Sequence, residues 1–348
     1  MSQGYTVAVV GATGAVGQKI IEKLVDRSFP FATLKLLASK KSAGKEVEVN
    51  GSTYIIEEAT PASFEGVDIA FFSAGGSISK ALAKEASNRG AIVIDNTSAF
   101  RMDKDTPLVV PEVNKQALHE HTGIIANPNC STIQMVCALE PIRQKFGLNK
   151  VIVSTYQAVS GAGAAAIEEL TTQSEEIKMK QAKPEILPVK SAEKHFPIAG
   201  NVIPQIDVFT EDGFTFEEHK MMNETKKIMS LPNLAIAATC VRVPVVTGHS
   251  ESVYVEVEQD NVTLDQVKQL LADSDGIILQ DDPAQQLYPM PYFAEDKDHV
   301  FVGRLRKDPS NDKGFHMWIV SDNLLKGAAL NSIQIAEALI AEGILKEV

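Results

Sequence analysis

Cys130 stands in a context that favours a reactive thiol. It follows the apolar run Ile124–Asn127 and precedes Ile133–Phe146, a run with helical periodicity. A cysteine at the start of a helix lies near the positive end of the helix dipole and near free backbone amides, which favour the thiolate and could stabilise an oxyanion. We therefore predict that Cys130 is a nucleophile. Cys137 and Cys240 lie in apolar runs and are predicted core residues.

A nucleophilic thiol needs an acid or base partner, and a substrate anion needs a cation. Of the seven histidines, His249 is the leading candidate by position, because it lies in a Gly-containing loop between two predicted strands. Arg242 is the lone charge in the apolar run Ala235–Val246, so it calls for a buried anion. No His or carboxylate cluster has metal-ligand spacing, so no metal is expected.

A glycine-rich loop, Gly11-Ala-Thr-Gly14-Ala-Val-Gly17, follows the first predicted strand and opens a predicted helix. Glycines there let the backbone approach a pyrophosphate, whose charge suits a helix N-terminus. The second predicted strand is followed by Ser39–Lys45, which has two adjacent lysines and no carboxylate. An NAD site usually has Asp or Glu at this point, so we predict NADP(H) as the cofactor.

The surrounding pattern predicts an α/β first domain with a Rossmann-type parallel sheet. Short apolar runs without polar alternation read as strands buried on both faces. They are Val7–Val10, Leu34–Ala38, Ile69–Ser73, Ile92–Asp95 and Ile124–Asn127, with helices predicted at Gln18–Arg27 and Ser79–Arg89.

The second half predicts an α+β catalytic and dimerisation domain with a mixed or antiparallel sheet. Its strands are expected at Val151–Ala158, Leu234–Val246 and Glu251–Glu258, the last alternating apolar and polar residues. Helices are expected at about 164–181 and at Glu217–Met229, and Leu324–Glu342 should form an amphipathic helix. We place the domains at residues 1–128 and 129–323, with 324–348 packing back on the first.

The composition of the chain limits the classes of binding partner. With 33 Lys+Arg against 45 Asp+Glu the formal charge is −12, which argues against nucleic acid or an anionic membrane as a partner. Three cysteines without a CxxC pair suggest reduced thiols. No signal-like or membrane-spanning stretch occurs, so we expect a cytoplasmic protein.

Together these segments resemble the aspartate-semialdehyde dehydrogenases along essentially the whole chain. The motifs that carry the resemblance are Gly11–Gly17, Asn129–Thr132, Gln157–Gly163, Asn201–Pro204, Glu217–Met221, Arg242–Pro244, Gly248–Ser250 and Asp322–Ala329. The resemblance implies reversible, NADPH-dependent reductive dephosphorylation of L-4-aspartyl phosphate to L-aspartate 4-semialdehyde. This reaction belongs to the biosynthesis of lysine (through diaminopimelate), threonine and methionine.

The resemblance also implies roles for individual residues. Cys130 would carry the acyl group as a thioester, and Gln157 would hold that group near the thiol. His249 would be the general acid/base, since its unperturbed pKa lies near operating pH. The substrate-binding residues would be Arg242 for the α-carboxylate, Glu217 for the α-ammonium group, Arg101 and Lys220 for the phosphate, and Asn129.

For the cofactor the resemblance indicates three groups of residues. They are Gly11, Thr13, Gly14, Ala15 and Val16 around the pyrophosphate, Lys41 and Ser42 at the 2′-phosphate, and Ser160, Gly161 and Asn323 near the nicotinamide half. Lys41 stands where we expect arginine, and lysine lacks the planar stacking of a guanidinium, so the preference for NADP could be less strict.

The expected assembly is a homodimer or a homotetramer, with the segment 164–204 as a candidate for subunit contact by resemblance. Three alternatives stay open at this point. N-acetyl-glutamyl-phosphate reductase runs the same chemistry on an acetylated substrate. A glyceraldehyde-3-phosphate dehydrogenase would be expected to have an acid after the second strand, and a non-catalytic NADP-binding sensor would not need the thiol.

Overall fold

The computed structural model describes residues 4–176 and 183–345. The chain divides into two compact units, which we describe separately. The first comprises the described residues up to Asn129 together with those from Ala328 onward, and the second runs from Cys130 to Gly327. No helix in the described ranges is long and apolar enough to cross a membrane.

The first unit contains a seven-stranded sheet in the order β3-β4-β2-β1-β5-β6-β7. The pairings along β4-β2-β1-β5-β6-β7 are parallel, and the short edge strand β3 is antiparallel to β4. The strands are β1 Tyr5–Val10, β2 Phe31–Ala38, β3 Glu46–Val49, β4 Ser52–Glu58, β5 Ile69–Phe72, β6 Ile92–Asp95 and β7 Ile124–Ala126. The five predicted strands are present, and β3 and β4 were not predicted because neither is a continuous apolar run.

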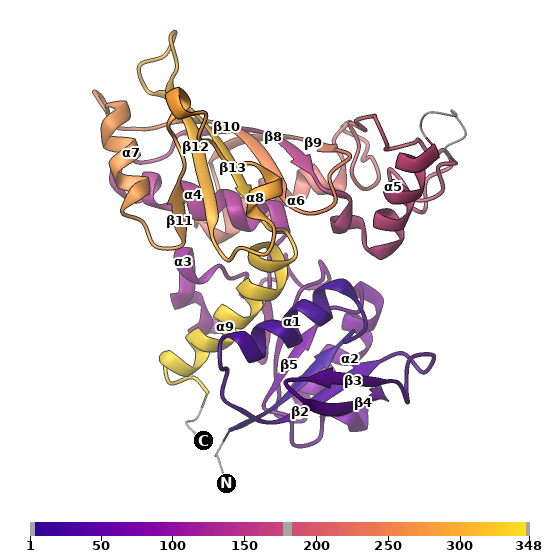
Figure 1. Cartoon of the computed structure of the whole chain (residues 1–348). Coiled ribbons are helices and arrows are strands. Elements are labelled where there is room, and N and C mark those ends of the chain that lie inside the picture. The colour runs from indigo at the N-terminus through magenta and orange to yellow at the C-terminus, as the bar shows by residue number, and fades with distance from the viewer. Residues whose placement is uncertain (1–3, 177–182, 346–348) are drawn as a thin grey trace. The chain divides into compact units, whose positions relative to one another are not determined.

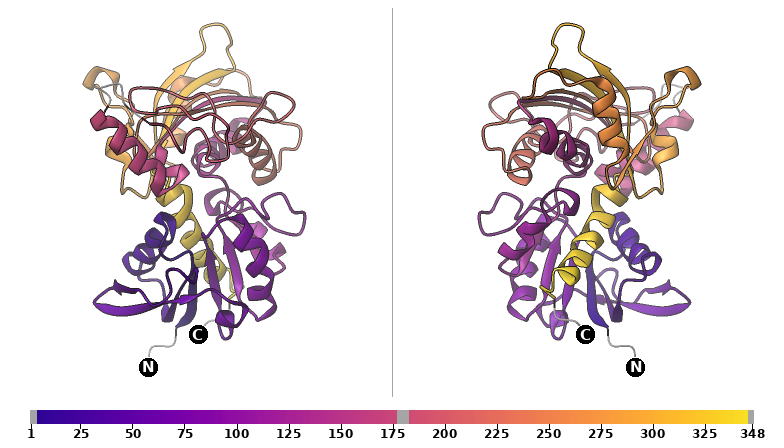
Figure 2. Two further views of the ribbon diagram at one scale, coloured as in Figure 1. Left: turned by 90° about the vertical axis from the view of Figure 1, so that its right-hand side faces the viewer. Right: turned by 90° about the vertical axis from the view of Figure 1, so that its left-hand side faces the viewer.

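Helices cover both faces of this sheet. α1 (Ala15–Asp26) and α9 (Leu330–Ala341) share one apolar core, and α2 (Gly76–Asn88) contributes to the other. Figures 1 and 2 show α9 beside α1. The shorter helical segments are α3 Pro111–Asn114, η1 Pro61–Phe64 and η2 Lys115–Glu120.

The predicted C-terminal helix differs from the structure in two ways. It begins with a π-helical segment, Leu325–Ala329, and becomes α-helical only at Leu330. The helix packs on the core of the first unit, as expected. Most of α9 is buried, including the polar residues Asn331 and Ser332, so it is less amphipathic than we expected. Asn331 donates to the Val109 carbonyl at 3.0 Å and thereby satisfies its amide inside the core.

The second unit contains a six-stranded mixed sheet in the order β11-β12-β13-β10-β8-β9. Its strands are β8 Lys150–Gln157, β9 Ala235–Arg242, β10 His249–Glu256, β11 Ile277–Leu279, β12 Val300–Lys307 and β13 Gly314–Ser321. β8 is parallel to β9, whereas β10 is antiparallel to both β8 and β13. The helices are α4 Cys130–Phe146, α5 Ala164–Glu176, α6 Phe216–Ile228, α7 Leu264–Ala272 and α8 Pro291–Ala294.

α4, α6 and α7 pack on one face of this sheet, as Figure 1 shows. Two expectations need correction here, and a third is only partly tested. The strand predicted to reach Val246 ends at Arg242, because Pro244 has no amide hydrogen to continue a ladder. His249 is not in a loop but is the first residue of β10. The helix expected at 164–181 is described as far as Glu176, and residues 177–182 lie outside the described ranges.

Candidate active site

Three neighbouring strands bring Arg242, Gln157 and His249 to one edge of the second sheet. Gln157 and Arg242 are register partners at the ends of the parallel strands β8 and β9. His249 begins β10, one residue before Ser250, which pairs with Tyr156 of β8. These three side chains, which we call the site row, are 3%, 1% and 0% exposed, so none of the three acts in bulk water.

Cys130 is the first residue of α4, so its thiol lies at a helix N-terminus, as predicted. Gln134, one turn further along α4, donates from its amide to the His249 carbonyl at 3.3 Å and accepts from the Ser321 hydroxyl at 2.8 Å. These bonds tie the first turns of α4 to the strand ends that carry the site row. Gly327 packs so closely that a Cβ there would lie 2.7 Å from the Cβ of Cys130, so only glycine fits beside the thiol.

The imidazole of His249 has a fixed orientation. The Ala158 amide donates to its Nδ1 at 3.0 Å, so the proton of the neutral ring must be on Nε2. Nε2 is buried and has no hydrogen-bond partner within the described residues. Burial, reinforced by the nearby charge of Arg242, lowers the pKa of His249 to about 3. The expected acid/base role starts from the unperturbed pKa, and in the folded chain the pKa of His249 lies well below that value.

Arg242 places a buried cation close to the thiol. Burial lowers its pKa, and the nearby Glu217 and Cys130 oppose that effect. Its Nη1 donates to the Ala158 carbonyl at 2.6 Å, whereas its Nε is buried without a hydrogen-bond partner in the described part of the chain. A Cβ at Gly161 would lie 3.2 Å from both Arg242 Nη1 and His249 Nε2, so a glycine keeps this space open.

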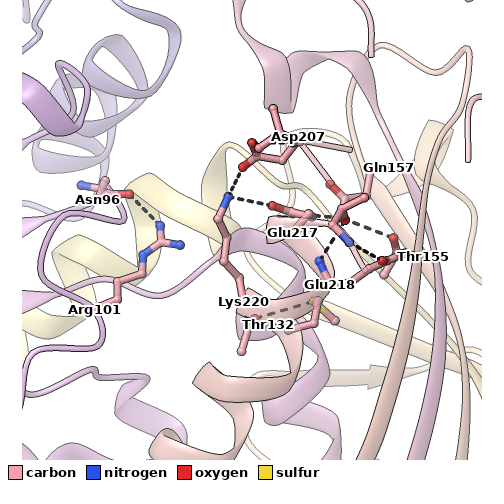
Figure 3. A network of polar contacts seen from close by, with 12 residues as sticks. Asn96, Arg101, Thr132, Thr155, Gln157, Asp207, Glu217, Glu218 and Lys220 are labelled. Carbon is pink, nitrogen blue, oxygen red and sulfur yellow. Dashed lines mark hydrogen bonds and ion pairs between the residues drawn. The ribbon is translucent and has the colours of Figure 1, made fainter. Parts of the chain in front are cut away.

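Glu217 of α6 links the site row to a lysine (Figure 3). Gln157 donates from Nε2 to Thr155 Oγ1 at 3.3 Å and to Glu217 Oε1 at 3.2 Å. Lys220 Nζ donates to the other Glu217 oxygen at 3.2 Å. Glu217 is 5% exposed, which is unusual for a carboxylate and marks it as part of a buried polar network.

A second polar row lies behind the site row on the same face of the sheet. Because side chains alternate along a strand, Cys240, Thr155 and Glu251 share the face of Arg242, Gln157 and His249. Thr155 is the register partner of both Cys240 and Glu251. Burial raises the pKa of Cys240, with Glu217 adding to the effect, so this thiol stays protonated and is not a second nucleophile.

Glu251 is fully buried, and neither carboxylate oxygen has a hydrogen-bond partner among the described residues. Burial raises its pKa well above the ordinary value, against a smaller opposite effect of the Gln134 amide. The folded chain therefore holds a proton that the unfolded chain releases. The stability that this group contributes is complete below pH about 4.5 and is lost as the pH rises through its folded pKa.

We expect Glu251→Gln to unfold at a similar denaturant concentration as the wild type near pH 4.5 and to be more stable at pH 8. The difference should grow by at most about 1.4 kcal/mol per pH unit, because one proton is linked to unfolding. Urea titrations from pH 4.5 to 8 measure it. Glu258→Gln, an exposed carboxylate just beyond β10, is the control. If the stability difference between Glu251→Gln and the wild type stays constant across this pH range, Glu251 does not have a raised pKa in the folded chain.

Ser160, Gly161 and Asn323 also lie in the second unit. Asn323 accepts from the Gly248 amide at 2.8 Å and donates to the Ser160 hydroxyl at 2.9 Å. These bonds hold the turn that precedes His249. The three residues thus lie beside the site row, and their expected contact with a nucleotide stays a prediction.

Arg101 and Asn129 belong to the first unit. Arg101 is 8% exposed and donates to two backbone carbonyls, from Nε to Asn127 at 2.9 Å and from Nη2 to Asn96 at 2.8 Å. These bonds fix the guanidinium inside the unit. Asn129 is 6% exposed and directly precedes Cys130.

The glycine loop between β1 and α1 has the geometry of a dinucleotide loop. Gly11 has φ +91°, a conformation that side-chain-bearing residues rarely adopt. A Cβ on Gly17 would collide with the Gly11 carbonyl, so this glycine allows the helix to approach the loop. Gly14 caps α1 without a side chain, and Thr13, Ala15 and Val16 are at least partly exposed around this helix start. Lys41 is exposed and Ser42 is partly exposed in the turn after β2. These residues fit an anionic dinucleotide.

Sequence reasoning missed three residues of this region. Gln134 could have been found, because it lies four residues after Cys130 and hence on the same helix face. Glu251 could also have been found, because it follows His249 by two residues in an alternating strand. Asp207, which binds Lys220, carries no local signal. Within the described residues, no group of three or more His, Cys, Asp or Glu could hold a metal ion.

Comparison with known proteins agrees with this architecture. Two family models match, the semialdehyde dehydrogenase NAD binding domain over residues 6–121 and the semialdehyde dehydrogenase dimerisation domain over residues 139–326. A Bacillus subtilis aspartate-semialdehyde dehydrogenase is 65% identical over 97% of this chain and 98% of its own.

Solved structures extend the comparison. Aspartate semialdehyde dehydrogenase II of Vibrio cholerae, complexed with ASA, has a TM-score of 0.91 and 46% identity over 98% of this chain and 99% of its own. The Candida albicans enzyme with NADP has a TM-score of 0.75 and 27% identity over 98% and 99% of the two chains.

A nicotinamide-dinucleotide-binding unit joined to a unit with a helix-start thiol defines an oxidoreductase of the aldehyde-dehydrogenase kind. Within that class, the chain belongs to the aspartate-semialdehyde dehydrogenase family.

Proposed function

We propose that this chain catalyses the reversible, NADPH-dependent reductive dephosphorylation of L-4-aspartyl phosphate to L-aspartate 4-semialdehyde. The observation that carries the proposal is the buried pair of opposite charges beside the thiol, Arg242 and Glu217. An α-amino acid presents a carboxylate and an ammonium group, and it matches this pair. A substrate with an acetylated nitrogen has no ammonium group to offer to Glu217.

Cys130 is the proposed nucleophile. Its thiolate attacks the acyl carbon of the substrate, the carbon–sulfur bond forms, and the bond to the phosphate oxygen breaks. The acyl group is then held on Cys130 as a thioester, and Gln157 keeps it in place with an uncharged amide. The reduced nicotinamide, when bound, supplies the hydride. Expulsion of the thiolate from the resulting tetrahedral carbon regenerates Cys130 and releases the aldehyde.

His249 has a narrower proposed role than the general acid/base expected from the sequence. Its proton on Nε2 and its low pKa suit a neutral ring that donates a hydrogen bond. Both tetrahedral species carry negative charge on the former carbonyl oxygen. A preorganised donor aimed at such an oxygen stabilises it without a full proton transfer.

The other binding roles follow from charge. Arg242 has a buried Nε left to bind a carboxylate, and we propose that it binds the α-carboxylate. Lys220 and Arg101 are the proposed cations for the phosphate, and Asn129 is proposed as a further substrate-binding residue. For the cofactor we propose Gly11, Thr13, Gly14, Ala15 and Val16 at the pyrophosphate, Lys41 and Ser42 at the 2′-phosphate, and Ser160, Gly161 and Asn323 at the nicotinamide half.

An oxidative assay tests the function. The chain is supplied with phosphate, NADP and either L-aspartate 4-semialdehyde or N-acetyl-L-glutamate 5-semialdehyde, and reduced cofactor is followed by absorbance. We expect turnover with the first aldehyde only and a higher kcat/KM with NADP than with NAD. Turnover with only the acetylated aldehyde would reject the assignment. Cofactor binding without any turnover would favour a sensor.

We also propose a homodimer that buries the outward face of the second sheet. Ile152 and Tyr156 of β8 are 42% and 37% exposed there, on the face opposite α4 and α6. Trp318 of β13 packs on Tyr156 with ring centroids 5.3 Å apart. A mostly apolar sheet face needs a cover, and the dimerisation family model spans these strands. A contribution of segment 164–204 to subunit contact stays a prediction.

Ile152→Glu is expected to shift the chain from dimer to monomer, because a buried unpaired carboxylate opposes association. Analytical ultracentrifugation at micromolar concentration measures the shift. The control is Ile55→Glu, which changes an equally apolar and more exposed residue of β4 in the first unit. A dimer that survives Ile152→Glu would place the interface elsewhere.

A further inference from the structure

Lys220 is held between two carboxylates. Its Nζ lies 2.8 Å from Asp207 Oδ2 and 3.2 Å from Glu217 Oε2. Figure 3 shows the two contacts diverging from one ammonium group. Glu217 lies one helical turn before Lys220 on α6, whereas Asp207 comes from the segment that precedes the helix. The groups proposed to bind the phosphate and the α-ammonium of the substrate are therefore bound to each other.

The backbone around Asp207 places its carboxylate firmly. Its φ is +68°, a left-handed conformation that Asp tolerates better than most residues. Its Oδ1 accepts from the Val208 amide at 2.9 Å, which leaves Oδ2 for Lys220. Four residues earlier, Ile203 exchanges two backbone hydrogen bonds with Arg242, at 2.9 and 3.0 Å. This segment is thus anchored to the same residue that is proposed to bind the α-carboxylate.

In the mechanism that we infer, binding of the substrate exchanges these partners. An α-ammonium group bound to Glu217 takes the place of Lys220, and a phosphate bound to Lys220 takes the place of Glu217. During that exchange Lys220 loses one of its two carboxylates. A long lysine side chain without a fixed partner gains rotamer freedom, which opposes its use as a ligand. Asp207 is the partner that does not change.

We propose that Asp207 is a positioning residue that keeps Lys220 at the phosphate subsite while Glu217 passes from Lys220 to the substrate ammonium. This inference rests on the proposed function for the identity of the two substrate groups. It assigns Asp207 no contact with the substrate. The competing possibility is that Asp207 is only a negative charge near an anion site, which would weaken phosphate binding by repulsion.

The variant Asp207→Asn separates the two possibilities. Asparagine accepts the left-handed backbone, so the fold should be retained, but the charge that holds Lys220 is lost. If Asp207 positions Lys220, we expect about tenfold weaker binding of inorganic phosphate, since Lys220 loses a charged hydrogen-bond partner. We expect similar increases in KM for phosphate and for the aldehyde, with kcat changed less than about threefold. A merely repelling charge predicts tighter phosphate binding instead.

Asp212→Asn is the matched control. Asp212 also lies just before α6 and pairs with a side chain of that helix, His219, at 3.1 Å, but it is exposed and outside this network. The Asp212→Asn variant should leave phosphate binding unchanged, and also the KM for phosphate and for the aldehyde. In a Glu217→Gln background, Asp207→Asn should raise the KM for the aldehyde much less, because Glu217 can no longer compete for Lys220.

Calorimetric titration of the full chain with inorganic phosphate keeps the two proposals distinguishable. A wild-type chain that binds phosphate but turns over neither aldehyde would reject the proposed function, and the Asp207 inference would still be decided by the titration. Unchanged or tighter phosphate binding by Asp207→Asn would overturn the inference. So would equal losses in thermal stability and kcat with no change in KM.

Discussion

Replacing Cys130 by alanine is expected to lower kcat by several orders of magnitude while cofactor binding is retained. The substitution removes the atom that forms the thioester, so the covalent route is lost and not merely slowed. The glycine loop that we assign to the cofactor lies in the other unit and is not touched by the change. The measurements are kcat in the oxidative assay and cofactor affinity by fluorescence titration.

Cys137→Ala is the control for this variant. Cys137 is a buried core residue of the same helix, two turns beyond Cys130, and its loss should cost stability without abolishing turnover. A Cys130→Ala protein with more than about a tenth of wild-type turnover would contradict the thioester mechanism. Cys240 could not then replace it as the nucleophile, because burial keeps that thiol protonated.

The second large effect is expected from His249→Ala. Removing one oxyanion donor lowers kcat by about 10²–10³-fold, and loss of a general acid or base lowers it by a similar 10²–10⁴-fold. The size of the effect therefore shows that His249 takes part, but not how. Thermal unfolding should accompany the kinetics, since the Ala158 amide also loses its partner. His299→Asn, an exposed histidine of the same unit, is the control.

The pH dependence separates the two roles of His249. With a pKa of about 3, the ring is neutral from pH 5 to 8, so kcat should show no limb with a midpoint near 6.5. A wild-type limb near pH 6.5 that disappears in His249→Ala would instead support the general acid/base. Stability gives an independent check. Because the folded pKa is depressed, the contribution of neutral His249 is present above pH about 6.5 and is lost as the pH falls toward 3.

Much of the fold could be read from local patterns. The buried parallel strands and their helices follow from apolar runs and helical periodicity, and both act over a few residues. The glycine loop is also local, because Gly11 and Gly17 meet constraints set within one strand–helix turn. Local patterns missed β3 and β4, because each strand places only one residue, Val49 or Ile56, in the buried core, and the two strands pair with each other.

The position of Cys130 at the start of a helix could be predicted from its neighbours in the sequence, and a helix N-terminus favours a thiolate. The sequence also indicated that Arg242 must be buried near an anion, because a lone arginine in an apolar strand has no other place. The resemblance to a known family indicated which other residues belong to the site and which substrate groups they would bind. Neither source described the electrostatic state of the site.

The electrostatic state of the site follows from contacts between different elements of the folded chain. The pKa of His249 depends on complete burial and on the charge of Arg242 seven residues away along the chain, across a turn. The ion pairs of Lys220 depend on Asp207, and the raised pKa of Glu251 depends on its complete burial. Burial and distance between residues from different elements set these properties. No local pattern in the sequence encodes them, because they arise only once the strands and helices have packed together.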